Sequence, residues 1–216
     1  MKNIKVWDIF VRVFHWSLAL AVISQLATAD EFKSLHVKGG YFIIVLLVLR
    51  VAWGFVGSRY ARFTDFIYPP SEILAYLKGL FQGRPRHYVG HNPAGGAMVL
   101  ALLFFLALTT FTGLLTYGAE GKGSLALQSI DVTARAWADD DDRYDDERHD
   151  SGGQSEDHAG RGAAGEKDPF WKEIHETLAG IIIFLASLHF CGVIASSYLH
   201  KENLILAMIT GTKKTT

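Results

Sequence analysis

Four histidines lie within or at the ends of strongly apolar stretches, at positions His15, His36, His175 and His189. Ionisable side chains inside such stretches are rare and are usually functional. An imidazole can ligate a metal, relay a proton or hydrogen-bond to a neighbouring helix. A helix rises about 1.5 Å and turns about 100° per residue, so His175 and His189 face nearly the same way, about 21 Å apart. One helix therefore offers one imidazole at each of two levels.

Each of these levels needs a second ligand at matching depth. His15 lies near the start of the first apolar stretch, and His36 begins the second stretch after a short connection. If successive stretches cross a membrane in opposite directions, His36 lies level with His175 and His15 lies level with His189. Inverting the whole topology exchanges inner and outer levels and leaves the two pairs unchanged.

A flat, apolar cofactor held by two axial imidazoles fits this arrangement. Haem b bound by two histidines needs ligands from facing helices and no covalent attachment. Zinc fits less well, because it prefers a compact set of three or four ligands at one depth. A proton relay is an alternative, but these spans carry no interior carboxylate. Hydrogen bonding between helices is the simplest alternative for any one of the histidines.

Two arginines are candidates for binding haem propionates. Arg50 is the charge deep within the second stretch, fourteen residues after His36, and therefore on the same face at the level of the other histidine pair. Arg12 lies three residues before His15, on one helix face. Arg12 could equally extend to the lipid headgroups.

Long apolar runs must position these side chains, because half of the 216 residues are hydrophobic and they are gathered into four stretches. About 20 apolar residues suffice for a helix to cross a bilayer. The sequence predicts an all-α membrane protein, a bundle of four transmembrane helices in one domain over residues 1–216. The expected spans are about 10–29, 36–57, 94–117 and 173–199. Short amphipathic pieces are expected in the connector after the second span and in the tail.

The side of the membrane follows from the flanking Lys and Arg residues. Their modest excess, with Arg59 and Arg62 just after the second span, predicts that both termini are cytoplasmic in a bacterial inner membrane. Residues 119–168 then form a periplasmic loop that we expect to be flexible. Within it, residues 139–150 hold eight acids and two arginines, which favours a solvated segment or a steering patch for a basic partner. No nucleic-acid partner is expected.

Several motifs resemble the bacterial cytochrome b561 family, which includes the b-type cytochrome subunits of nickel–iron hydrogenases. They are "RVFHW", "HVKGGYFIIVLLVLRVAWGFVGS", "RHYVGHNPAGGAMVL" and "HKENLILAMITG". The resemblance covers most of the chain except residues 119–168. It implies a di-haem membrane protein that moves electrons between the quinone pool and a partner, with His15, His36, His175 and His189 as the haem ligands. The long acidic loop departs from the compact members of the family.

The resemblance also implies partners and sites that the residues alone do not define. The redox partner would be a periplasmic protein such as a c-type cytochrome or a hydrogenase, and the chain would be an electron-transfer component of a quinone-linked oxidoreductase. Quinone would bind where a haem edge meets the inner interface, with His91, His200 and Lys201 as candidates. Two alternatives stay open: oxidation of superoxide at the outer haem, and a non-redox membrane anchor or proton-relay subunit.

Overall fold

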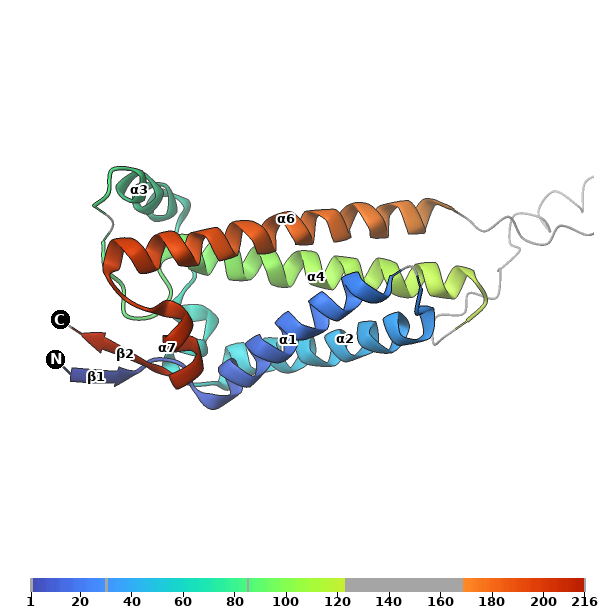
Figure 1. The fold of residues 1–216 in the computed structure, drawn as a ribbon, viewed down its shortest axis with the longest axis horizontal. Helices are drawn as coiled ribbons and strands as arrows, with labels where there is room; N and C mark the ends of the chain where they lie inside the picture. The colour runs from blue at the N-terminus through green and yellow to red at the C-terminus, as the bar shows by residue number, and fades with distance from the viewer. Residues whose placement is uncertain (1, 30, 85, 123–168, 216) are drawn as a thin grey trace, which may run out of the picture.

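Four long helices run side by side along the longest axis of the molecule (Figure 1). The computed structural model describes residues 2–29, 31–84, 86–122 and 169–215. The long helices are α1 (Ile9–Thr28), α2 (Lys33–Val56), α4 (Pro93–Ala119) and α6 (Pro169–His200). All four are long and apolar enough to cross a membrane. The predicted class, a helical membrane protein with four spans, is confirmed.

Both termini lie at one end of the bundle, which we call the terminal end. There β1 (Lys2–Lys5) pairs antiparallel with β2 (Thr212–Thr215) in a small ribbon that the sequence did not predict. The opposite end, where the chain leaves α4 and enters α6, is called the loop end. The acidic segment 139–150 lies outside the described residues. The compartment that each end faces stays a prediction.

Short elements at the terminal end connect the spans. Between α2 and α4 the chain forms two 3₁₀ turns, Arg59–Ala61 and Phe63–Asp65, followed by helix α3 (Pro70–Phe81). After α6, helix α7 (Leu204–Thr210) leads into β2. The amphipathic pieces expected in the connector and in the tail are therefore helical.

Local chemistry explains where several helices begin. Asp8 accepts a hydrogen bond from the Val11 amide at 2.8 Å, so its carboxylate caps the first turn of α1. Asn92 caps α4 in the same way through the Gly95 amide, at 2.7 Å. Such caps satisfy amides that have no partner inside the helix. These caps thus mark where both spans begin, and both starts lie at the terminal end (Figure 1).

A glycine makes the close approach of the two termini feasible. Gly211 ends α7 with φ of 83°, in the left-handed region that favours glycine. A Cβ at this position would lie 2.6 Å from the Trp7 carbonyl oxygen. Val6 and Trp7 both donate amide hydrogen bonds to the Gly211 carbonyl, at 2.9 and 3.1 Å. This turn therefore joins the N-terminal segment to β2.

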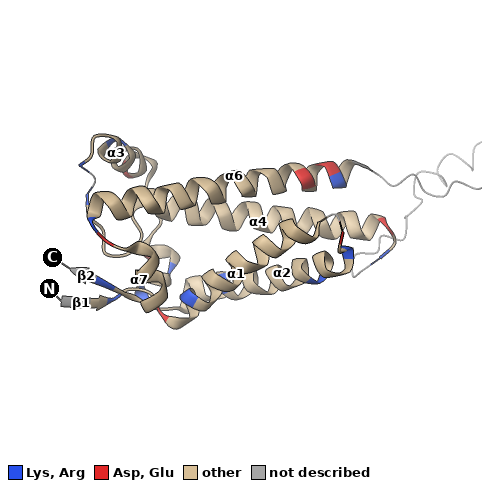
Figure 2. Ribbon diagram, viewed as in Figure 1, with Lys and Arg blue, Asp and Glu red and all other residues tan. Residues whose placement is uncertain are grey.

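The spans associate as two helix pairs. Helix α1 packs on α2 and α4 packs on α6, whereas α6 has almost no close backbone contact with α1 or α2 among the described residues. Apolar side chains of Ile43, Leu47, Leu106 and Ile182 fill the middle of the bundle. Charged residues lie toward the ends of the spans (Figure 2). Large apolar side chains cover the outer surface, as expected where lipid surrounds the protein.

Candidate functional site

The four histidines of the apolar spans form two facing pairs, one near each end of the bundle. At the loop end the ring centres of His36 and His175 are 6.1 Å apart. At the terminal end those of His15 and His189 are 6.4 Å apart. Helix α6 contributes one ring to each pair, while α2 and α1 contribute the others. The structure therefore brings together the residues that the depth argument paired, and their role as ligands stays a prediction.

The imidazoles face one another across the junction between the two helix pairs. Ile182 lies seven residues from both His175 and His189, within the apolar cluster that fills the middle of the bundle. Two sites at different depths are thus separated by packed hydrocarbon. No group of three or more His, Cys, Asp or Glu side chains able to hold a metal occurs among the described residues. Each site therefore offers two protein ligands, which is fewer than zinc prefers.

Backbone carbonyls orient both rings of the loop-end pair. His175 Nδ1 lies 2.9 Å from the Thr109 carbonyl oxygen, and His36 Nδ1 lies 3.1 Å from that of Gln25. A carbonyl only accepts, so each Nδ1 carries the proton and donates it. The lone pair of each ring then lies on Nε2. This is the arrangement that histidines ligating a metal usually show, with the second nitrogen bound to an oxygen.

Close contacts hold the loop-end rings in place. A Cβ on Gly113 would lie 3.0 Å from His175 Cε1, so α4 approaches this ring with no side chain between them. Gln25 also donates from Nε2 to the His36 carbonyl oxygen at 2.9 Å, which ties α1 to α2. Sequence reasoning missed Gln25 and Thr109. The Gln25 side chain was visible as a polar residue inside an apolar span, whereas Thr109 acts through its backbone carbonyl, for which the sequence carries no signal.

The terminal-end pair has a different environment. Three nitrogens near it are buried and have no hydrogen-bond partner among the described residues, namely Nδ1 of His15, Nε of Arg12 and Nδ1 of His91. Buried polar groups are almost always satisfied in folded proteins. These three nitrogens are therefore available to a bound group.

The two arginines proposed for propionate binding both lie at the terminal end. Arg50 is only 3% exposed, donates to the Ala61 carbonyl oxygen at 3.2 Å, and lies within about 6 Å of the rings of three phenylalanines. Arg12 packs against Gly211 and keeps its Nε unpartnered. Arg12 is therefore the more available donor, while Arg50 supplies buried positive charge.

The three quinone candidates are also at the terminal end, in two different places. The His91 ring packs against Trp7 and Phe66, with centroid distances of 4.6 and 4.7 Å. Burial, together with the positive charges of Arg50 and Lys213, lowers the pKa of His91 to about 3, so this ring is neutral at physiological pH.

His200 and Lys201 lie at the end of α6. The His200 ring packs against that of His87, with a centroid distance of 5.5 Å, and Lys201 is exposed. No described contact joins either residue to His91. The structure therefore does not bring the three quinone candidates together.

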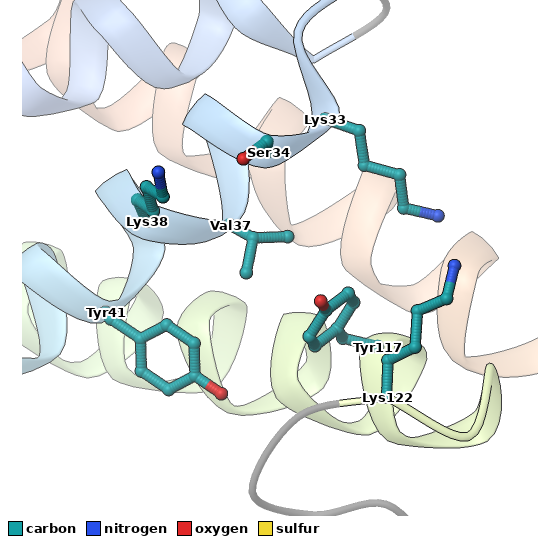
Figure 3. A pocket seen from close by; sticks show the side chains of 7 residues that line it. All are labelled: Lys33, Ser34, Val37, Lys38, Tyr41, Tyr117 and Lys122. Carbon is teal, nitrogen blue, oxygen red and sulfur yellow. The ribbon is translucent and has the colours of Figure 1, made fainter.

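A separate pocket of about 470 Å³ opens at the loop end (Figure 3). Lys33, Lys38 and Lys122 line it together with Ser34, Val37, Tyr41 and Tyr117. Lys33 forms an ion pair with Glu120 at 2.5 Å, which links the start of α2 to the end of α4. None of the four span histidines lines this pocket, so it is distinct from the histidine sites.

The ring spacing suits a metal between two imidazoles. If both imidazoles held one metal through bonds of about 2 Å, with about 1 Å from each nitrogen to its ring centre, their ring centres would lie about 6 Å apart. The observed 6.1 and 6.4 Å agree with this value. The free Nε2 atoms at the loop end and the unsatisfied nitrogens at the terminal end also fit a haem with its propionates.

A family comparison agrees with these features. The family described as prokaryotic cytochrome b561 matches residues 6–211, almost the whole chain. The chain belongs to this family. As a member of the cytochrome b561 family it is a membrane b-type cytochrome, which implies bound haem b. The family resemblance seen in the sequence motifs is thus confirmed.

Curated relatives are named probable Ni/Fe-hydrogenase B-type cytochrome subunits. The proteins from Rhizobium leguminosarum bv. viciae and Rhodobacter capsulatus are 26% and 28% identical to 56% of the chain, covering 62% and 57% of their own lengths. A hydrogenase 1 subunit of Escherichia coli K12 is 24% identical over 54% of the chain and 61% of its own length. The matches thus span about three fifths of each relative. No solved structure matches the chain significantly.

Proposed function

We propose that this cytochrome b561 family protein holds two haems b and transfers single electrons across the membrane. The axial ligands are His36 with His175 at the loop end and His15 with His189 at the terminal end. The observation that carries the proposal is the pair of facing imidazoles near each end, with ring centres 6.1 and 6.4 Å apart. When bound, the haems supply one-electron redox chemistry at the two levels.

The protein's own residues orient the ligands and set the charge around them. The Thr109 and Gln25 carbonyls fix the tautomers of His175 and His36 and increase the basicity of their Nε2 atoms. At the terminal end, Arg12 offers an unpartnered donor to a propionate, and Arg50 adds buried positive charge. Aliphatic side chains between the two levels exclude water from the bundle interior.

The charges that flank the spans support an orientation of the chain in the membrane. We assign the terminal end to the cytoplasm and the loop end to the periplasm of a bacterial inner membrane, because Arg59 and Arg62 follow α2 at the terminal end. Quinone would exchange electrons at the terminal end, with His91, His200 and Lys201 as candidate contacts. Because no described contact joins His91 to the other two, we treat His91 and the His200–Lys201 end of α6 as two alternative quinone sites.

The partner at the loop end would be a periplasmic redox protein. The relatives' names support a hydrogenase, and a c-type cytochrome is the alternative of the same class. The acidic residues 139–150 would favour a partner with a basic surface. Co-purification of the full chain with a tagged candidate, repeated at high salt, distinguishes a charge-steered contact from a permanent subunit.

A reduced-minus-oxidised absorption spectrum of the purified full chain tests the haem assignment. We expect b-type bands and a haem-to-protein ratio near two. Addition of a quinol should then reduce the haems, whereas the oxidised quinone should not. A ratio near one would overturn the two-site version, and absence of b-type bands would overturn the proposal itself in favour of a non-redox role.

A further inference from the structure

We propose that α3 is an interfacial anchor, which inserts one side into the lipid leaflet at the terminal end and places its basic residues among anionic headgroups. The occupant of its exposed apolar side is therefore a lipid surface. This inference is independent of the haem assignment, because it depends on the connector between α2 and α4 and on none of the histidine pairs.

The position of α3 suits an interface. Its axis lies across the direction of the four spans, at the terminal end of the bundle (Figure 1). Tyr76 fastens it there, with its hydroxyl 3.3 Å from Ser196 Oγ, and Asn92 donates to the same oxygen at 3.5 Å. Ser196 lies in the last turns of α6, and Asn92 caps α4. Helix α3 therefore lies level with the ends of two spans, where the headgroups begin.

The apolar side of α3 is wider than the strip that packs on the protein. Tyr76 is only 5% exposed and faces the bundle, whereas Leu74 and Phe81 are 67% and 88% exposed. At about 100° per residue, Leu74 and Phe81 lie only about 20° apart around the helix, well away from Tyr76. Leu77 lies about 40° from Phe81 around the helix, on the side toward Tyr76. The apolar arc thus continues from the packed strip to a second strip that no described residue covers.

The charges around this strip match an anionic surface. The exposed basic residues Lys78, Arg84 and Arg86 lie on or just after α3, against a single acid, Glu72, in residues 70–86. A helix with one apolar side and flanking Lys and Arg residues is the kind that lies in the plane of a membrane interface. Long basic side chains at that level can reach phosphates while their methylene groups stay in contact with apolar surface.

Anchoring of α3 would also hold residues of the terminal-end site in place, because they contact the connector that contains α3. The connector that contains α3 supplies Ala61, whose carbonyl accepts from Arg50, and Phe66, whose ring packs on His91. The segment before α3 is therefore bound to Arg50 of α2 and to His91, which follows α3, and α3 is the portion between Phe66 and His91 that reaches outward. A lipid-anchored α3 would hold this wall of the site in place.

Site-directed fluorescence on the full chain tests the proposal. Cys191 is the one cysteine of the sequence, so Cys191→Ser gives a background for single labels. An environment-sensitive fluorophore is attached in Phe81→Cys and, as a matched control, in Glu72→Cys, an exposed position about 180° from Phe81 around the helix. The protein is placed in nanodiscs of phosphatidylglycerol or of phosphatidylcholine. Quenching by nitroxide-labelled lipid is then compared with quenching by aqueous iodide.

We expect the label at position 81 to be quenched by nitroxide lipid at least about twofold more than the label at position 72, with the reverse order for iodide. Equal iodide access at both positions would overturn the insertion, and would leave the strip available to a protein partner instead. Should Phe81→Cys not elute as a folded protein, Leu74→Cys replaces it.

A comparison of an anionic with a zwitterionic lipid tests the contact between α3 and anionic headgroups. Replacing the basic residues together (Lys78→Gln, Arg84→Gln, Arg86→Gln) should remove the stronger lipid quenching that we expect in phosphatidylglycerol relative to phosphatidylcholine. Equal quenching in the two lipids before any charge is removed would overturn the contact with anionic headgroups.

Discussion

The two histidine pairs have nearly the same ring spacing and very different surroundings. At the loop end, both Nδ1 atoms donate to main-chain carbonyls of neighbouring residues in the spans, and α4 touches the His175 ring at Gly113. At the terminal end, His15 Nδ1 has no partner among the described residues, and buried cationic side chains lie nearby. Backbone carbonyls orient the rings of the loop-end pair, whereas buried cationic side chains lie beside the terminal-end pair.

This difference teaches how two histidine pairs of similar geometry can be given different properties. Backbone carbonyls fix ring orientation and cannot be changed by mutating the residues that carry them. Cationic side chains act over longer distances and raise the energy of whichever redox state is more positive. We therefore expect the loop-end site to respond mainly to packing changes, and the terminal-end site to respond mainly to charge changes.

Removing one ligand from each pair gives the largest expected effect. His175→Ala should remove the loop-end haem and His189→Ala the terminal-end haem, so that each variant retains about one haem per chain, because each iron then lacks one axial ligand. Haem-to-protein ratios and potentiometric titrations measure this, and the haem that remains should differ in potential between the variants. His87→Ala is the control and should keep both haems. Loss of both haems, or of neither, from either span variant would contradict two independent sites.

Crowding the loop-end ring should have an intermediate effect. A Cβ introduced by Gly113→Ala would lie 3.0 Å from His175 Cε1, so the ring must move by a few tenths of an ångström. We expect partial loss of the loop-end haem, with a haem-to-protein ratio between one and two, and no change in the terminal-end potential. Gly180→Ala is the matched control, because a Cβ there has open space around it. A Gly113→Ala protein with both haems and unchanged potentials would show that packing does not set this site.

Changing a charge at the terminal end should have the smallest effect. Arg50→Gln removes a buried cation that disfavours the more positive, oxidised state of a nearby haem, so the midpoint potential of that haem should fall by roughly 50 mV. Potentiometric titration measures the shift, and Arg50→Lys, which keeps the charge, should largely restore the original value. An equal shift in both haems, or a rise at the terminal end, would break the contrast between the two sites.

Much of the architecture could be predicted because it depends on properties that act along one helix. The long apolar runs predicted four membrane-spanning helices, and the fourteen-residue spacing of His175 and His189 predicted their common face. Asp8 and Asn92 mark the starts of α1 and α4 by a local mechanism that needs only the next three residues. The pairing of histidines by depth followed from the alternation of span direction.

The surroundings of each pair could not be predicted, because they bring together residues that are far apart in the sequence. Thr109 is 66 residues from the ring it orients, and Gln25 reaches His36 because α1 packs against α2. Nothing local indicated that β1 and β2 would join the termini, since four-residue strands gain their stability only from each other and from the turn at Gly211. Likewise, the face of α3 that packs on the bundle was chosen by Tyr76 meeting Ser196.

By itself, then, the sequence determined the spans and the helix faces that carry the histidines, because hydrophobic periodicity and helical rise are properties of consecutive residues. Its motifs indicated the family. The tertiary structure alone decided which carbonyls orient the loop-end rings, which cations lie beside the terminal-end pair, and which side of α3 stays uncovered. Those outcomes depend on how separate helices meet, and that is settled by packing across the whole chain.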